Sequence, residues 1–350
     1  MKIAFVGDLE LGAFPFDPNY HKFDQMDPFK HVRSLLRKYD WVIGNLECSI
    51  ETKYKSNSEM LCEKKLIKTI PKNFILNVAN NHINDYGAKH SRETFDYLLN
   101  KHKIIGRKKK PFTILNYKNK KIGIIGASFV IDNKYKIKEY LYRPQNEELK
   151  LLTKLIKKKS DYLIFYAHWG SEFVQKINKE QLQLAQFLYQ ECNIDLLIGS
   201  HSHCIQNDYK LNKKPIITGL GSFISGYNFR KLNTSKLLEI ESKMGDKGKI
   251  KLHSKIFKGF KQPHYQTKKK IIYKNINIVN NYAIFIARNS IRIRIFIYIL
   301  RNLLKYDRFF FKWILNRFYY FVKNFYKEFF EPNIVYQKYL NNSYRKFKIK

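Results

Sequence analysis

Short apolar runs, largely β-branched, alternate with amphipathic stretches along the first 260 residues. Several runs lack polar alternation, which is typical of strands that are buried on both faces. They predict strands at residues 2–6, 40–45, 74–79, 120–128, 161–168, 194–200 and 215–223. The stretches between them predict helices at residues 27–39, 88–102, 146–158 and 179–191, the first with Asp27 as its cap and Pro28 in its first turn. This alternation indicates an α/β fold.

The chain changes character near residue 262, where a Lys-rich joint leads into a long aromatic and basic segment. On a helical projection of residues 288 to about 330, basic residues fall on one stripe and aromatic residues cover the other faces. An interfacial helix needs this pattern, because rings enter the acyl boundary while cations meet anionic headgroups. The alternative is a helical cover packed on the domain, with its basic ends in solvent. The residues predicted to bind a membrane are Arg301, Lys305, Arg308, Lys312 and Trp313.

The net charge of +37 is extreme and unevenly distributed. Residues 251–350 hold 23 Lys or Arg but only three Asp or Glu, so they carry more than half of the excess. Such an excess indicates an anionic partner: a membrane surface, an anionic polymer, a phosphorylated substrate or nucleic acid. Nucleic acid is the least favoured, because no nucleic-acid-binding motif is recognisable.

Four cysteines, Cys48, Cys62, Cys192 and Cys204, are scattered and form no C-x-x-C pair. This spacing argues against a zinc ribbon or a disulfide scaffold and fits a reducing compartment. The chain runs from Met1 directly into a predicted strand, so no signal peptide is expected. A membrane-spanning helix needs about 18 or more apolar residues, and no stretch meets this requirement. We therefore expect a cytoplasmic protein, with peripheral attachment to the inner face of the membrane as the alternative.

Side chains that can hold a metal follow five of the predicted strands. They are Asp8 and Glu10; Asn45 and Glu47; Asn80, Asn81, His82 and Asp85; His168 and Glu172; and His201 and His203. Each alone has a structural explanation, since Asn and Gly are common in loops and a buried His can be satisfied by its neighbours. Ligand sites in α/β sheets, however, form at the carboxyl ends of strands. Five coincidences there predict one crevice, and carboxylate, amide and imidazole donors together suit two divalent ions such as Mn, Fe or Zn.

Six short motifs occur in order along the chain: GDLELG, NLECSI, ANNHINDYG, HWGSEF, GSHSHCIQ and LGSFI. With these motifs, residues 1 to about 240 resemble the CapA-type capsule, or poly-gamma-glutamate, biosynthesis proteins, which are relatives of the calcineurin-like metallophosphoesterases. The resemblance implies a four-layer β-sandwich flanked by helices, to which the basic aromatic helical tail is appended. The implied organisation is a metallophosphoesterase-type domain at residues 1–258, a linker at 259–287 and the tail at 288–350.

The resemblance also implies a role for each position of the site. The first metal would be held by Asp8 and His203, with Glu47 as the bridge, and the second by Asn81, His168 and His201. His82 matches the catalytic or anion-stabilising His of the family. Asp85 and Glu172 would orient the other groups of the site.

The chain departs from the family pattern at four positions. Glu10 stands where the phosphoesterases have His, and Glu47 stands where the bridging residue is usually Asp. Ser202 replaces a common Pro, and Ser222 replaces a common Asn. We expect Glu10 to supply the oxygen ligand that the first site lacks, or that site to be weak and often empty. A solvent-facing Glu10 is the remaining alternative.

The predicted activity is metal-dependent hydrolysis or transfer at an anionic centre, where metals polarise the scissile group and lower the pKa of a bound water. The implied biological role is bacterial capsule or exopolymer biosynthesis. One alternative is a phosphoesterase that acts on nucleotides or nucleic acid, which would explain the charge. The other is a non-catalytic accessory protein of a membrane biosynthetic complex. The metal content of the purified protein would distinguish this alternative from the two enzyme hypotheses.

Overall fold

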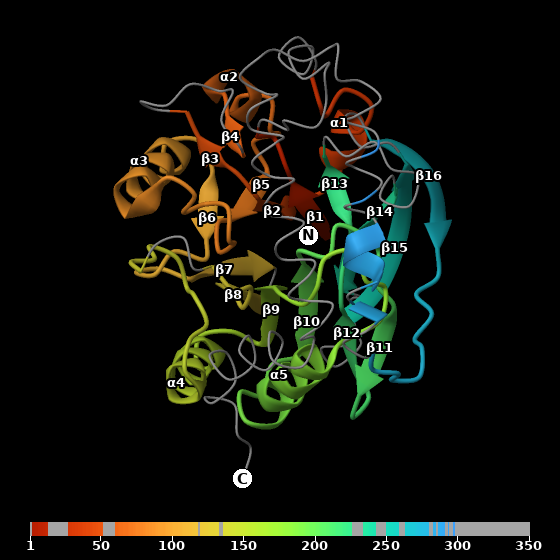
Figure 1. Ribbon diagram of the computed structural model, residues 1–350. Helices are drawn as coiled ribbons and strands as arrows, with labels where there is room; N and C mark the ends of the chain where they lie inside the picture. Colours follow the sequence, from red (N-terminus) through yellow and green to blue (C-terminus); the bar gives the residue numbers. More distant parts are fainter. Residues whose placement is uncertain are drawn as a thin grey trace.

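Two β-sheets face each other at the centre of the protein (Figure 1). The computed structural model describes residues 2–12, 27–51, 60–117, 120–132, 136–225, 234–242, 250–258, 263–279, 283, 284, 286–290, 293 and 297. In this part of the chain, the larger sheet has the order β16 (His264–Lys269), β15 (Ile250–Lys258), β14 (Thr234–Ser242), β1 (Lys2–Leu9), β2 (Trp41–Leu46), β5 (Phe74–Asn77) and β6 (Lys103–Ile105), with β13 (Ser222–Ile224) paired to β1. The smaller sheet has the order β11 (Asp208–Leu211), β12 (Lys214–Ile217), β10 (Leu196–Ser200), β9 (Tyr162–His168), β8 (Lys120–Ser128) and β7 (Phe112–Tyr117). A short parallel pair is formed by β3 (Ser49–Ile50) and β4 (Leu61–Cys62).

Alternation along the central strands builds three hydrophobic cores. On β1, Ile3 and Phe5 pack between the sheets, whereas Ala4 and Val6 pack on the outer side. Both faces of the strand are therefore covered, as its continuous apolar run predicts. The outer face of the larger sheet is covered by α1 (Arg33–Leu36), α2 (Lys64–Ile67) and α3 (Gly87–Leu99), and that of the smaller sheet by α4 (Asn146–Lys157) and α5 (Lys179–Gln190). The predicted four-layer α/β sandwich is confirmed.

A β-bulge in β1 changes which side chains enter the space between the sheets. Where β1 pairs with β2, Phe5 opposes Ile43 and Asp8 opposes Asn45, so β1 contains one extra residue. Because side chains alternate with a period of two, the extra residue reverses the alternation. Asp8 therefore lies between the sheets, whereas an unbroken strand would have sent it outward with Ala4.

The first predicted helix is much shorter than expected. Residues 27–39 were expected to be helical, but only α1 is, and the residues before it form tight turns. One such turn is closed by the backbone N–H of Val32, which donates to the carbonyl of Phe29 (3.0 Å). The predicted cap is also wrong, because the N-cap of α1 is Val32. The Asp27 carboxylate instead accepts from the backbone N–H of Phe29 (3.0 Å) in the turn before the helix.

Two predicted boundaries between strands also differ. The apolar run at residues 215–223 forms two strands, β12 in the smaller sheet and β13 in the larger one. The chain passes from one sheet to the other at Gly221, whose φ of 75° suits glycine. The larger sheet also continues past residue 258, because β16 pairs with β15 inside the range predicted as a linker.

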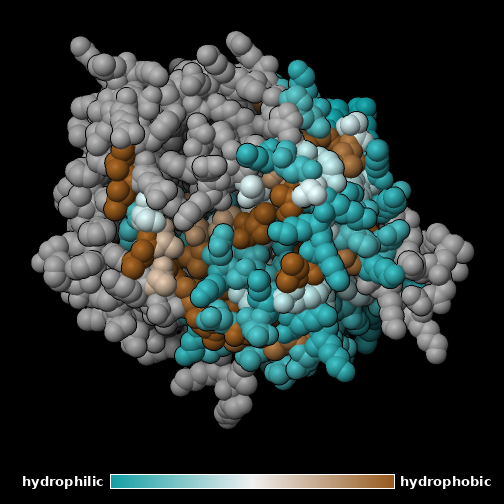
Figure 2. Space-filling view, turned by 90° about the vertical axis from the view of Figure 1, so that its right-hand side faces the viewer, coloured by the Kyte–Doolittle hydropathy of each residue, from teal (hydrophilic) through white to brown (hydrophobic). Residues whose placement is uncertain are grey.

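The predicted membrane-binding residues of the tail, Arg301, Lys305, Arg308, Lys312 and Trp313, lie outside the described residues, so their role stays a prediction. Within the described part of the chain, no helix is both long enough and apolar enough to cross a membrane. The side of the molecule seen in Figure 2 mixes hydrophobic residues with hydrophilic ones. Several isoleucines between residues 272 and 297 are exposed at the surface.

A buried ion pair joins the two sheets. Nζ of Lys236 in β14 lies 2.6 and 2.7 Å from the two carboxylate oxygens of Asp208 in β11. Burial raises the pKa of Asp208, and the Lys236 cation opposes that rise.

Replacing Lys236 with Met should leave Asp208 buried without a counter-ion and lower the free energy of unfolding by about 3–5 kcal/mol, measured by urea denaturation. The matched control, Lys268→Met, changes an exposed residue of β16 and should lower the free energy of unfolding by less than about 0.5 kcal/mol. Equal losses of stability in the two variants would contradict this account.

Candidate metal centre

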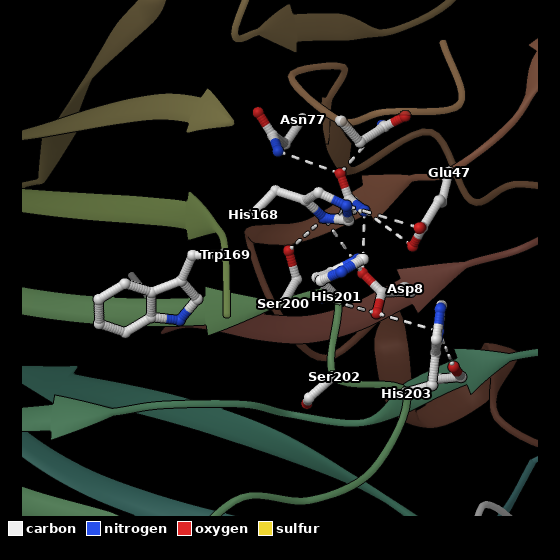
Figure 3. Close-up of polar contacts among 12 residues, drawn as sticks. Asp8, Glu47, Asn77, His168, Trp169, Ser200, His201, Ser202 and His203 are labelled. Atoms are coloured by element: carbon white, nitrogen blue, oxygen red, sulfur yellow. Dashed lines mark hydrogen bonds and ion pairs between the residues drawn. The ribbon is translucent and has the colours of Figure 1, made fainter. Parts of the chain in front are cut away.

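The side chains at the ends of the strands meet between the two sheets (Figure 3). In the larger sheet, Asp8 lies beside Asn45 and Asn45 lies beside Asn77, across three parallel strands. In the smaller sheet, His168 is paired with Ser200 at the ends of β9 and β10. The carboxyl ends of both sheets therefore border the same space, as expected for a ligand site in an α/β protein.

Three carboxylates are buried together in this space. Asp8, Glu10 and Glu47 are each 0% exposed, and with His203 they offer ligand atoms that all lie within 4.8 Å of one another. Burial raises the pKa of Asp8 to about 6, although His203 opposes the rise. Burial and the neighbouring carboxylates raise the pKa of Glu47 well above its ordinary value. Burial lowers the pKa of His203, but Glu10 and Asp8 outweigh burial and raise it to about 9. The carboxylates therefore favour a cation beside them, which either the His203 imidazolium or a bound metal ion can supply.

A second group of ligand atoms belongs to Glu47, His168 and His201, again within 4.8 Å of one another. Glu47 Oε1 and His201 Nδ1 are buried and make no hydrogen bond to any described residue. Buried polar atoms usually have a partner, and one metal ion held by this group would satisfy both. Burial lowers the pKa of His201 to about 3 and that of His168 well below its ordinary value. Both imidazoles are therefore neutral, as metal ligands must be.

The turn between β10 and β11 holds its two histidines in an uncommon backbone conformation. The φ angle is 88° at His201 and 53° at His203, values that residues other than glycine rarely adopt. Strain of this kind gathers at functional sites. The backbone N–H of His201 donates to Asp8 Oδ2 (3.0 Å), which ties the turn to β1. Ser202 points away from the cluster and donates to the carbonyl of Cys204 (2.7 Å) (Figure 3).

His168 contacts two asparagines of the other sheet's side, Asn45 near the end of β2 and Asn81 after β5. Its Nε2 lies 2.8 Å from Asn81 Oδ1, which brings two of the three predicted ligands of the second metal together. Its Nδ1 lies 3.1 Å from Asn45 Nδ2. The same amide nitrogen donates to Asp8 Oδ1 (2.8 Å) and to Glu47 Oε2 (3.3 Å). Asn45, for which the sequence suggested no specific role, thus links both carboxylates to His168.

His82 lies at the edge of the cluster, with 29% of its side chain exposed and Nε2 4.0 Å from Glu47 Oε1. Its Nδ1 lies 2.9 Å from Asp85 Oδ2. Burial lowers the pKa of His82, but the Asp85 carboxylate outweighs burial, so the pKa is raised. Asn80 accepts from the backbone N–H groups of His82 (3.1 Å) and Ile83 (2.9 Å), so this Asn fixes the turn.

Glu172 lies where the cluster meets solvent, with 26% of its side chain exposed. Its carboxylate forms a third group with His201 and His203, in which the ligand atoms lie within 4.8 Å of one another. The sequence predicted an orienting role for Glu172, and its position is close enough for direct ligation as well.

Glu10 is buried, which excludes the solvent-facing alternative. Its Oε2 accepts from Ser225 Oγ (2.7 Å), and its Oε1 accepts from Ser222 Oγ. The same Oε1 lies 2.8 Å from His203 Nδ1. The contact with Ser225 could not be anticipated, because more than 200 residues separate the two side chains in the sequence.

Replacing Glu10 with Gln should weaken Mn²⁺ binding by at least about tenfold in a calorimetric titration, because a neutral amide replaces a carboxylate beside the first site. The variant Ser225→Ala removes one hydrogen bond but keeps the carboxylate, so its loss of affinity should be smaller. If Mn²⁺ affinity is the same in Glu10→Gln as in the wild type, Glu10 is not a ligand.

Residues 2–227 match the family described as bacterial capsule synthesis protein PGA_cap. The chain belongs to this family. This capsule synthesis protein is 24% identical to the PGA biosynthesis protein CapA of Bacillus subtilis (strain 168), over 72% of this chain and 70% of the relative. It is also 24% identical to the capsule biosynthesis protein CapA of Bacillus anthracis, over 68% of this chain but only 63% of that protein. The predicted family is confirmed.

Among solved structures, a calcineurin-like phosphoesterase from Bacillus subtilis is similar to the capsule synthesis protein. The two are 13% identical, the match covers 84% of this chain and 97% of the other, and the TM-score is 0.42. The four-layer fold of this chain is shown by its strand order and its three hydrophobic cores.

Proposed function

We propose that this member of the capsule synthesis family is a metal-dependent hydrolase that acts at an anionic centre of its substrate. The observation that carries the proposal is the pair of buried atoms Glu47 Oε1 and His201 Nδ1, which make no hydrogen bond to the described residues. They belong to a cluster of four carboxylates and three histidines. The imidazolium of His203 offsets only part of this buried negative charge, and burying the remainder without a further cation is costly in stability.

The donor atoms fit two divalent ions that share Glu47. One would be held by Asp8, Glu10, Glu47 and His203, and the other by Glu47, Asn81, His168 and His201. Oxygen and imidazole donors without thiolates suit Mn, Fe or Zn. Such ions supply Lewis acidity and lower the pKa of a coordinated water to near neutrality.

The residues around the metal ligands hold the reacting groups of the site in position. Asp85 fixes the ring of His82 through Nδ1 and leaves Nε2 on the side of Glu47. The raised pKa of His82, which Asp85 produces against the effect of burial, favours an imidazolium that can donate a proton to a leaving oxygen. Asn45 holds Asp8 and Glu47 in place, so the two carboxylates need no reorganisation when substrate binds.

An anionic capsule polymer or a phosphorylated precursor is the proposed substrate class. The net charge of +37 attracts both. The names of the two relatives refer to PGA and to capsule biosynthesis, which favours an anionic exopolymer.

The proposal is tested by turnover after metal reconstitution. Full-length protein is stripped with a chelator, reloaded with Mn²⁺, Fe²⁺ or Zn²⁺, and assayed on a phosphate monoester, a phosphate diester and a γ-glutamyl polymer. We expect hydrolysis of at least one substrate by reloaded protein and none by stripped protein. If reloaded protein binds metal but hydrolyses nothing, the non-catalytic alternative is correct.

A further inference from the structure

A segment that follows β16 returns to the open side of the metal centre; its described residues are drawn in blue in Figure 1. The backbone N–H of Val279 donates to the carbonyl of Ile177 (3.0 Å), beyond the end of β9. Further along, Ile284 is 2% exposed and Asn289 is 3% exposed. The hydrogen bond and the two buried side chains anchor the segment on both sides of Arg288, which is partly exposed.

Arg288 reaches the edge of the metal centre. Its Nη2 lies 4.0 Å from Glu172 Oε2, and Glu172 shares a group of ligand atoms with His201 and His203. The low pKa of His201 has burial as its main cause, and the charge of Arg288 contributes to it. Arg288 therefore acts electrostatically on a proposed metal ligand, although 116 residues separate it from Glu172 in the sequence.

The guanidinium still has donors to offer. The contact with Glu172 is longer than a hydrogen bond, and Arg288 Nε is buried without a hydrogen bond to any described residue. The side chains of Arg288 and Glu172 are 27% and 26% exposed, so a ligand can approach from solvent. A planar guanidinium matches the two oxygens of a carboxylate or phosphate better than an ammonium group does.

We infer that Arg288 binds an oxyanion of the substrate, a phosphate or a carboxylate, beside the metal ions. This inference rests on the proposed function, and it adds a substrate-binding residue from a segment outside residues 2–227, the range that matches the family. Substrate would bring its oxyanion between the guanidinium and the metals. Glu172, which faces Arg288, would hold the guanidinium in place before substrate arrives.

The test is oxyanion binding by full-length, Mn²⁺-loaded protein, measured by calorimetry with inorganic phosphate and, separately, with glutarate. Arg288→Ala should weaken binding of one or both probes by about 10- to 100-fold, because charge-assisted hydrogen bonds are lost. Arg288→Lys should give an intermediate affinity, since it keeps the charge but not the planar fork. Bound Mn²⁺ should be unchanged in both variants. The probe that loses affinity identifies the oxyanion.

The matched control is Arg92→Ala, which removes an arginine from a surface ion pair with Glu139 and should bind both probes as the wild type does. Three results would overturn the inference: unchanged affinities in Arg288→Ala, equal losses in Arg92→Ala, or wild-type protein that holds Mn²⁺ but neither probe. A wild type that binds no metal would instead contradict the proposed function on which the inference rests.

Discussion

Replacing His82 with Ala is expected to lower turnover by about 10²- to 10⁴-fold, the usual contribution of a general acid or base. The amount of bound metal should not change, because His82 stands outside the three groups of candidate ligand atoms. Its Nε2 lies 4.0 Å from Glu47 Oε1, close to the proposed ions without joining their ligands. The measurement is kcat on whichever substrate the reloaded protein hydrolyses, together with metal content.

The variant Asp85→Asn provides the comparison for His82. An amide in place of the carboxylate keeps a contact with His82 Nδ1 but removes the charge that raises the pKa of His82. Turnover should fall less than in His82→Ala, and the pH profile should shift to lower pH as the pKa of His82 falls. Loss of metal in His82→Ala would contradict the role given to this residue.

Replacing His201 with Ala should remove about one of two bound metal ions per chain. His201 offers a ligand atom to the group of Glu47 and His168 and also to the group of Glu172 and His203. The buried Nδ1 of His201 makes no hydrogen bond to a described residue, so the substitution breaks no hydrogen bond of that atom. Metal content is measured by elemental mass spectrometry after desalting.

The control for His201 is His102→Ala. His102 is also a buried histidine, 8% exposed, but it lies outside the groups of candidate ligand atoms. Its substitution should leave the metal content unchanged, whatever it does to stability. Equal metal loss in the two variants would show that the loss follows from a general disturbance of the fold.

The fold and most residues of the site could be predicted because a few neighbouring residues are enough to recognise the end of a strand. The apolar run before His168 and the polar residues after it are adjacent in the sequence, and the carboxyl ends of parallel strands meet in space. The same reasoning placed Asn81 and His82 on one turn. The sequence therefore predicted which side chains meet in the site wherever each lies at a strand end and the strands share one edge of a sheet.

The features that the sequence did not reveal depend on contacts between distant segments. The bulge that turns Asp8 toward the other sheet follows from pairing with β2, and nothing in the local pattern marks the extra residue. Ser225 reaches Glu10 only because β13 pairs with β1. Arg288 is the first residue of the segment predicted as a basic aromatic tail, and its position beside Glu172 follows from how the chain packs there.

The central claim is that two divalent ions occupy the space between the sheets, and metal content tests it most directly. Wild-type full-length protein and Glu47→Gln are stripped, reloaded with Mn²⁺ or Zn²⁺, desalted and analysed by elemental mass spectrometry. The account predicts about two ions per wild-type chain and clearly fewer in Glu47→Gln, because Glu47 belongs to both groups of ligands. Wild-type protein that is folded but retains neither metal would contradict it.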